Sequence, residues 1–344
     1  MASLGVHLVG SVCGVDTAET SFRKCATGFP DRLRRLPDGE PAHRSQFILW
    51  QRDIFSSTPA VLKQYEWPMR VIPQPEVADA EVKEIVASLG PLKPGFAGAA
   101  LESYQVFKKL REEGVISKAT RFQVCLPTPV AVMCFMRNPS FQREIEPIYK
   151  KALLDEVKLI QEKIPKEELA VQWDVAPEMA TLEGHYAPHF EPYYEPIFEG
   201  ITSRLAELID SIDEQVEVGM HICYGDIQNK HFKEPEDTGL MVKLANAVLK
   251  DTKREVNWIH MPVPKERDDD PYFAPLKDLN LSKAELYLGL VHGHEEEQTL
   301  KRIEAAKRVV GEFGVATECG MARTPAEKFD SIAEISTKVS QPVA

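Results

Sequence analysis

The chain has 344 residues, of which 43% are hydrophobic, enough to bury the core of one barrel-sized domain or of two ordinary domains. Its formal net charge of -12 argues against a nucleic-acid-binding surface. No stretch approaches the roughly 18 to 20 consecutive apolar residues that span a bilayer, and the N-terminus lacks the basic and long apolar regions of a secretion signal. We therefore expect a cytoplasmic enzyme without a nucleic-acid or membrane partner.

Eight short apolar runs predict β-strands, and segments with helical periodicity separate most of them. In chain order, the predicted strands are 6–12, 34–38, 121–126, 169–174, 216–221, 256–260, 286–291 and 315–317. The predicted helices between them include 144–163, 197–212, 238–250 and 297–313. Eight strands that alternate with helices are typical of an α/β fold of the (β/α)8 TIM barrel type, which we predict as a single domain over residues 1–344.

The segment between the second and third predicted strands is too long for one simple crossover. Before a predicted helix at 99–113, its prolines include Pro68, Pro73, Pro75, Pro91 and Pro94. We predict that residues 55–118 form an insertion over one end of the barrel, with an edge hairpin around 70–72.

Polar residues follow most of the predicted strands. They are Ser11, Glu40, Asp174, His221 with Cys223, His260, His292 with His294, and Glu318 with Cys319. Barrel enzymes build their active sites at the C-terminal ends of the strands, where residues remote in sequence converge on one face. The pattern therefore predicts an active site at this face.

Three of these residues have the donor atoms that zinc prefers. His221, Cys223 and Cys319 offer one imidazole and two thiolates, and His221 and Cys223 are close enough in sequence to reach one ion. A tetrahedral site needs a fourth donor or an exchangeable position, and His260 is our candidate. The alternatives for that position are Asp226, Glu255 and water. Each residue alone fits an ordinary buried side chain, but together they predict a zinc site.

Two carboxylates accompany the predicted metal ligands. Asp174 ends a predicted strand, and Glu40 follows a predicted turn at 37–39. Two carboxylates in one pocket can hold an amine, act as acid and base, or bind a second ion. Either residue could instead cap a helix.

With these motifs, the chain resembles the catalytic C-terminal barrel of the cobalamin-independent methionine synthase family, within the superfamily shared with uroporphyrinogen decarboxylase. The resemblance extends over almost the whole chain, and the order and approximate spacing of the motifs follow the family. The motifs are Val9-Gly10-Ser11, Asp38-Gly39-Glu40, Leu126-Pro127-Thr128-Pro129, Val171-Gln172-Trp173-Asp174, His221-Ile222-Cys223, Val291-His292-Gly293-His294 and Glu318-Cys319-Gly320.

The resemblance implies a zinc site with one departure from the family. His221, Cys223 and Cys319 fall on zinc-ligand positions, whereas His260 takes the place of the family's glutamate ligand. Two thiolates and two imidazoles would make the site neutral, and a neutral site would acidify a bound thiol more strongly while making the thiolate a weaker nucleophile.

The resemblance also implies roles for the other polar residues. Glu40 and Asp174 would hold the amino group of the substrate, and the backbone near Ser11 would receive its carboxylate. Either His292 or His294 would donate a proton to the departing methyl carrier. No part of the sequence resembles the separate N-terminal barrel of the full-length synthase, which helps to bind polyglutamylated folate, so the methyl donor stays open.

The sequence thus predicts an enzyme similar to 5-methyltetrahydropteroyltriglutamate-homocysteine methyltransferase. Its Zn2+ would bind a small thiol, lower the pKa of that thiol and present the thiolate to a methyl or alkyl donor. Homocysteine is the leading acceptor, and another small thiol also fits. A metal-dependent lyase or decarboxylase of the same superfamily with a non-thiol substrate is one alternative, and a non-catalytic metabolite-binding relative is another.

Overall fold

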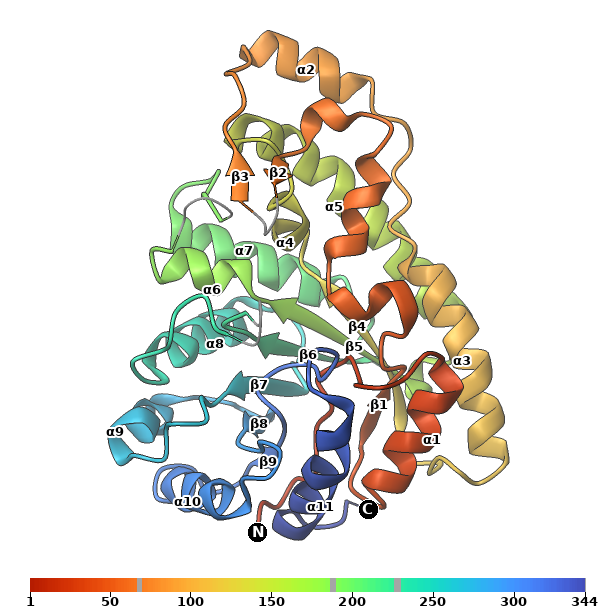
Figure 1. The fold of residues 1–344 in the computed structure, drawn as a ribbon, viewed down its shortest axis with the longest axis vertical. Helices are drawn as coiled ribbons and strands as arrows, with labels where there is room; N and C mark the ends of the chain where they lie inside the picture. The colour runs from red at the N-terminus through yellow and green to blue at the C-terminus, as the bar shows by residue number, and fades with distance from the viewer. Residues whose placement is uncertain (67–69, 186–189, 226–229, 344) are drawn as a thin grey trace.

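The fold is mixed α/β and is built around a curled parallel sheet that forms a half-barrel (Figure 1). The structure is a computed structural model that describes residues 1–66, 70–185, 190–225 and 230–343. The sheet has seven strands in the order β1-β4-β5-β6-β7-β8-β9. Their bounds are β1 Arg35–Pro37, β4 Arg121–Pro127, β5 Leu169–Val175, β6 Glu217–Ile222, β7 Trp258–Pro262, β8 Glu285–Gly289 and β9 Gly314–Val315.

Seven of the eight predicted strands each overlap one strand of the sheet. The exception is the predicted first strand, 6–12. This segment forms no regular strand; isolated bridges join Val6 to Leu33, just before β1, and to Val315 in β9. Farther along, the side-chain amide of Gln123 donates to the Leu8 carbonyl at 2.9 Å. Here a side chain of a neighbouring strand satisfies a backbone group that a regular ladder of backbone hydrogen bonds would otherwise pair. Through the bridges at Val6, the segment 6–12 connects both edges of the sheet.

The register of the parallel strands brings polar residues together. Every residue of β5 and of β7 is buried, as expected for a parallel sheet that is covered on both faces. Asp174 is the register partner of His221, and His221 is the register partner of His260. Because the three strands run parallel, these residues lie side by side near their C-terminal ends.

Helices cover the sheet and follow the predicted periodic segments. Those predicted from the sequence correspond to α3 Phe96–Glu112, α5 Pro139–Lys163, α7 Ile197–Asp210, α8 Gly239–Asp251 and α10 Glu296–Lys307. The further α-helices are α1 Ala18–Gly28, α2 Asp79–Ala87, α4 Pro129–Met133, α6 Pro177–Leu182, α9 Asp270–Phe273 and α11 Phe329–Val339. The short 3-10 helices are η1 Ala42–Gln46, η2 Leu49–Phe55, η3 Pro59–Val61, η4 Lys166–Glu168, η5 Ala274–Asp278 and η6 Ala326–Lys328.

The segment predicted as an insertion contains the predicted hairpin. β2, Gln64–Glu66, pairs antiparallel with β3, Arg70–Ile72. This hairpin and α2 lie beyond the sheet at the upper end of Figure 1, whereas α3 runs along its side. An antiparallel bridge between Leu62 and Met136 ties the hairpin's start to the chain after α4.

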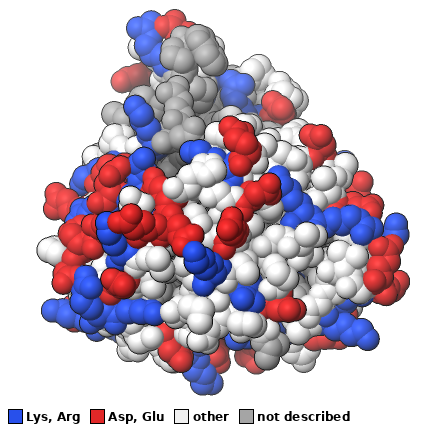
Figure 2. Space-filling model, turned by 60° about the horizontal axis from the view of Figure 1, so that its bottom comes forward, with Lys and Arg blue, Asp and Glu red and all other residues white. Residues whose placement is uncertain are grey.

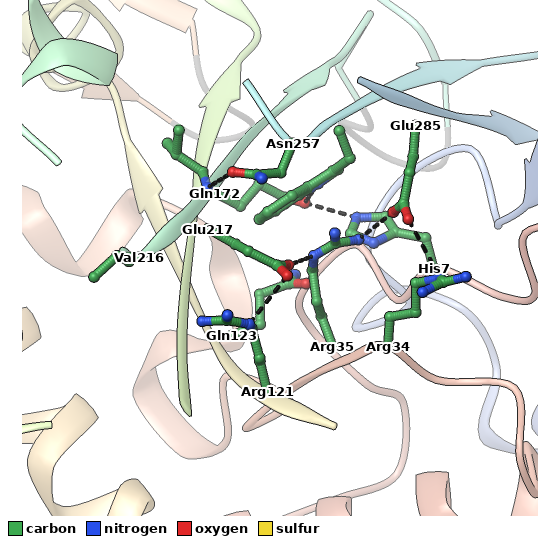
Figure 3. A network of polar contacts seen from close by, with 12 residues as sticks. His7, Arg34, Arg35, Arg121, Gln123, Gln172, Val216, Glu217, Asn257 and Glu285 are labelled. Atoms are coloured by element: carbon green, nitrogen blue, oxygen red, sulfur yellow. Dashed lines mark hydrogen bonds and ion pairs between the residues drawn. The ribbon is translucent and has the colours of Figure 1, made fainter. Parts of the chain in front are cut away.

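An ion-pair network joins the N-terminal ends of the strands (Figure 3). The Arg35 side chain is only 4% exposed and contacts Glu217 at 2.6 Å and Glu285 at 2.8 Å. Its guanidinium also lies over the Trp258 ring, 4.2 Å from the ring centroid. One buried cation therefore neutralises carboxylates from β6 and β8 and packs against β7, which fixes three strands relative to β1.

The surface carries both charge signs. Figure 2 shows a face on which Lys and Arg side chains lie between the Asp and Glu side chains. Among the described residues, the helices include none that is both long and apolar enough to cross a membrane.

Arg35→Ala should lower the free energy of unfolding by about 2–4 kcal/mol, because the change leaves two partly buried carboxylates without their shared cation. The matched control is Arg34→Ala, since the Arg34 side chain is 39% exposed and contacts only Glu285 in this network at 3.3 Å. It should cost less than about 1 kcal/mol. Urea unfolding followed by circular dichroism measures both, and equal losses would contradict the central position of Arg35.

Candidate metal centre

Three predicted ligands meet at the C-terminal ends of the strands. His221, Cys223 and Cys319 each offer one ligand atom, and these atoms lie within 4.8 Å of one another. The two sulfur atoms are 3.7 Å apart. The Cys223 amide donates to the Val175 carbonyl at 2.8 Å, so the pairing of β6 with β5 continues one residue past the strand and holds Cys223 in place.

The donor set fits a zinc ion. His221 is buried, and its Nε2 atom has no hydrogen-bond partner among the described residues. A buried polar atom without a partner costs about 1–3 kcal/mol, and a bound cation would remove that cost. One imidazole and two thiolates are zinc ligands, and a site with three protein ligands keeps a position open for a substrate.

His260, which the sequence predicted as the fourth ligand, does not lie in the group of three. Its Nδ1 atom lies 2.7 Å from Nδ1 of His221, and its Nε2 atom lies 3.0 Å from the Thr317 carbonyl oxygen. Both ring nitrogens therefore have partners, and His260 lies outside the group of three ligands. Burial lowers the pKa of His260 to about 3 and that of His221 well below its usual range.

Of the alternatives for the fourth position, Glu255 does not join the group of three. Glu255 is exposed, precedes the N-terminal end of β7 and forms an ion pair with Lys283 at 3.3 Å. It therefore lies at the opposite end of the strand from His260. Asp226 lies outside the described residues.

A small cavity brings the predicted substrate-binding residues to the three ligands. It has a volume of about 70 Å3, and Ser11, Glu40 and Asp174 line it together with His221, Cys223 and Cys319. Arg323 also lines the cavity, a residue that our sequence analysis missed because it lies outside the Glu318-Cys319-Gly320 motif, three residues after it. The structure thus places two carboxylates and one guanidinium beside the candidate metal ligands.

The environment of the two carboxylates favours their neutral forms. Burial, and then the charge of Asp38, raises the pKa of Glu40 to about 7. Burial, and then the charge of Glu40, raises the pKa of Asp174 well above its usual range. Gln172 donates from Nε2 to Asp174 Oδ1 at 2.8 Å. A cation between the two carboxylates would allow both to ionise.

The backbone holds Glu40 in an unusual conformation. Its φ angle is 49°, in the left-handed region that costs energy for a residue with a side chain. The Glu40 amide donates to Asp38 Oδ1 at 2.9 Å, and Arg44 and Ser103 hold the other oxygen of Asp38 at 2.5 Å and 2.7 Å. These contacts keep the Glu40 side chain directed at the cavity.

Gly320 allows the loop of Cys319 to approach the start of the chain. A Cβ atom on Gly320 would lie 2.3 Å from Ser11 Oγ. The Ala322 amide donates to Ser11 Oγ at 3.2 Å, and the Met321 amide donates to the Ser11 carbonyl at 2.7 Å. Ser11 therefore joins the loop that carries Cys319, and any side chain at Gly320 would push the two apart.

A larger cavity also borders Cys319. It has a volume of about 530 Å3, and His231, His292, Glu318 and Cys319 are among its lining residues. Nδ1 of His292 lies 3.7 Å from one oxygen of Glu318, and Nε2 of His231 lies 3.5 Å from the other. His231 was missed by the sequence analysis because it lies in a loop, eight residues after Cys223, without a motif.

The structure distinguishes the two histidines predicted as alternatives. His292 lines the larger cavity and its Nε2 atom lies 3.2 Å from the Val263 carbonyl oxygen. His294 is exposed, has a φ angle of 65° and donates from its amide to Ser331. Of the two, His292 is therefore the one beside the candidate metal centre.

Comparisons with known proteins give distant structural neighbours. No protein-family model and no curated protein matches the chain. A B12-independent methionine synthase from Shewanella sp. W3-18-1, in complex with selenomethionine, is 14% identical with a TM-score of 0.39, and the match covers 78% of this chain and 67% of that chain. A protein assigned as an alpha-L-fucosidase from Bacteroides thetaiotaomicron VPI-5482 is 12% identical with a TM-score of 0.39, covering 81% and 94%. Similarities of this size carry no inference about activity.

Glu40→Gln should stabilise the protein more at pH 8 than at pH 5. Folding raises the pKa of this carboxyl from 4.5 to about 7, so its ionisation destabilises the folded state as the pH rises through that range. Glutamine has no charge to desolvate, and the gain should grow by roughly 1–3 kcal/mol between the two pH values.

Urea unfolding at each pH, with samples of equal zinc content, measures this gain. Glu84→Gln, at an exposed position of α2, is the matched control. A gain from Glu40→Gln that is the same at both pH values would contradict the raised pKa.

Proposed function

We propose that this protein is a zinc-dependent transferase that moves a methyl or alkyl group to the sulfur of a small thiol, with homocysteine as the leading acceptor. The observation that carries the proposal is the group of His221, Cys223 and Cys319, whose ligand atoms lie within 4.8 Å of one another beside two carboxylates. The motif resemblance to the cobalamin-independent methionine synthase family supports the same activity.

We also propose that the whole chain folds as one (β/α)8 barrel. Val6 bridges both edges of the seven-stranded sheet, and a (β/α)8 barrel results if the segment around Val6 supplies the eighth strand. Residues 1–344 would then form one domain, with residues 55–118 as an insertion that carries the β2–β3 hairpin and α2.

A zinc ion held by His221, Cys223 and Cys319 would lower the pKa of a thiol at its open position, so that a thiolate is present at neutral pH. The three residues provide the ligand number of a catalytic site rather than of a closed structural one. Their two thiolates balance the charge of the ion, so the incoming sulfur adds the first net negative charge.

The small cavity suits the amino-acid end of homocysteine. Glu40 and Asp174 would hold its ammonium group, because both carboxylates ionise readily only when a cation lies between them. Arg323 lines the same cavity and would pair with the substrate carboxylate, near the backbone of Ser11. An amino acid bound in this way directs its side-chain sulfur toward Cys223 and Cys319.

The larger cavity would receive the alkyl donor. It shares Cys319 with the small cavity, so the two substrates can reach the same ion from different sides. When the methyl group moves to sulfur, the carrier keeps the electron pair of the broken bond and takes up a proton. His292 lines this cavity and is our candidate for the residue that relays it; burial lowers the pKa of His292 to about 3, so the proton would come from solvent through Nδ1, beside Glu318.

Cys223→Ser and Cys319→Ser should each release zinc while the protein stays folded, because serine is a poor zinc ligand. Zinc analysis after dialysis should give about one ion per chain for the wild type and much less for either variant. Cys134→Ser is the matched control, since that buried thiol contacts the Val130 carbonyl at 3.7 Å, away from the site. Full zinc retention by both site variants would refute the ligand assignment.

Asp174→Asn should weaken homocysteine binding by about 10- to 100-fold without affecting metal binding, because it removes one charge from the pair that holds the ammonium group. The experiment uses cobalt in place of zinc and follows the thiolate-to-cobalt absorption band during titration with homocysteine. 4-Mercaptobutyrate, which lacks the amine, should bind the wild type and the variant equally. Unchanged homocysteine affinity would remove the amine-holding role.

The same titration separates the alternative functions. A spectrum that changes with thiol supports the transferase. Tight cobalt binding without any thiol effect would indicate a metal-dependent lyase or decarboxylase. A wild-type protein that binds neither zinc nor cobalt would indicate a non-catalytic relative.

A further inference from the structure

We infer that His260 is a positioning residue, which together with the Thr317 carbonyl fixes the tautomer of His221 so that Nε2 of His221 is the metal-binding atom. The inference rests on the zinc site of the proposed function. In the methionine synthase family, a glutamate ligand stands at the position that His260 takes in this sequence. The inference gives His260 a positioning role instead of the role of a ligand.

The chain of hydrogen bonds has one consistent direction. The Thr317 carbonyl oxygen can only accept, so Nε2 of His260, at 3.0 Å, must carry the proton. His260 is fully buried, and its two described partners, a carbonyl and an imidazole, are not anions that would stabilise an imidazolium. A neutral His260 therefore has an unprotonated Nδ1 atom, which can only accept.

Because Nδ1 of His260 is an acceptor, it determines which ring nitrogen of His221 carries the hydrogen. The two Nδ1 atoms are 2.7 Å apart, so Nδ1 of His221 must donate the hydrogen between them. Nε2 of neutral His221 then carries a lone pair. This is the nitrogen that is buried without a hydrogen-bond partner among the described residues.

The backbone fixes this arrangement. His221 and His260 are register partners on β6 and β7, and Thr317 follows β9 in the segment that leads to Cys319. The hydrogen-bond chain therefore runs from the loop of one candidate ligand, through His260, to another candidate ligand. It orients the His221 ring in the absence of metal, which reduces the cost of ordering the site when an ion binds.

His260→Leu tests the positioning role, because leucine removes both hydrogen bonds with a side chain of similar volume. Zinc affinity, measured by competition with a chelating dye, should fall by about 10- to 100-fold. His260→Asn keeps an acceptor near the Nδ1 position and should retain zinc affinity within about threefold. His7→Gln is the matched control, since His7 is buried beside His260, with ring centroids 5.9 Å apart, but bonds to Gln172. It should keep the wild-type affinity.

A second measurement reads the tautomer directly. Long-range 1H–15N spectra of histidine-labelled full-length protein without metal should show His221 protonated at Nδ1 and His260 protonated at Nε2 in the wild type. After zinc is added, the Nε2 signal of His221 should shift. Protonation of His221 at Nε2 in the metal-free wild type would overturn the inference even if the leucine variant lost affinity.

The affinity outcomes separate this inference from the proposed function. Wild-type affinity in both His260 variants would overturn the positioning role and leave the zinc site intact. Loss of zinc from His260→Asn as complete as that from Cys223→Ser would also overturn it, because His260 would then be a ligand. A wild-type protein without zinc affinity would overturn the proposed function and this inference with it.

Discussion

The candidate site depends on the shared register of three parallel strands. In β5, β6 and β7, Asp174, His221 and His260 are successive register partners, so a carboxylate and two imidazoles lie side by side at the same depth of the sheet. Cys223 follows His221 beyond the end of β6, and its amide still pairs with β5. A slip of one residue in any of these strands would turn the side chain of its site residue to the other face of the sheet.

Polar side chains inside the curled sheet connect its two ends. At one end, Arg35 neutralises carboxylates from two strands and packs on Trp258. The Trp258 indole lies 3.4 Å from the side-chain oxygen of Gln172, whose amide nitrogen contacts Asp174 at the other end. Buried polar groups must find partners, and here Arg35 and Trp258 find theirs on other strands. The network therefore supports the strand order and register, and its member Gln172 orients Asp174.

The site divides into two cavities that share the loop of Cys319. Cys319 and Gly320 line both the small cavity with the two carboxylates and the larger one with His231 and His292. Under the proposed function, the small cavity would receive the acceptor and the larger one the donor.

The sequence by itself determined the α/β class and the parallel strands, and it predicted most residues of the candidate site, because apolar runs, helical periodicity and polar strand ends depend on neighbouring residues alone. It did not determine that the segment after Val6 has its backbone paired by glutamine side chains, or that both nitrogens of His260 have partners. It also left His292 and His294 equivalent. These features depend on which side chains of remote strands face each other, and only the tertiary structure decides that.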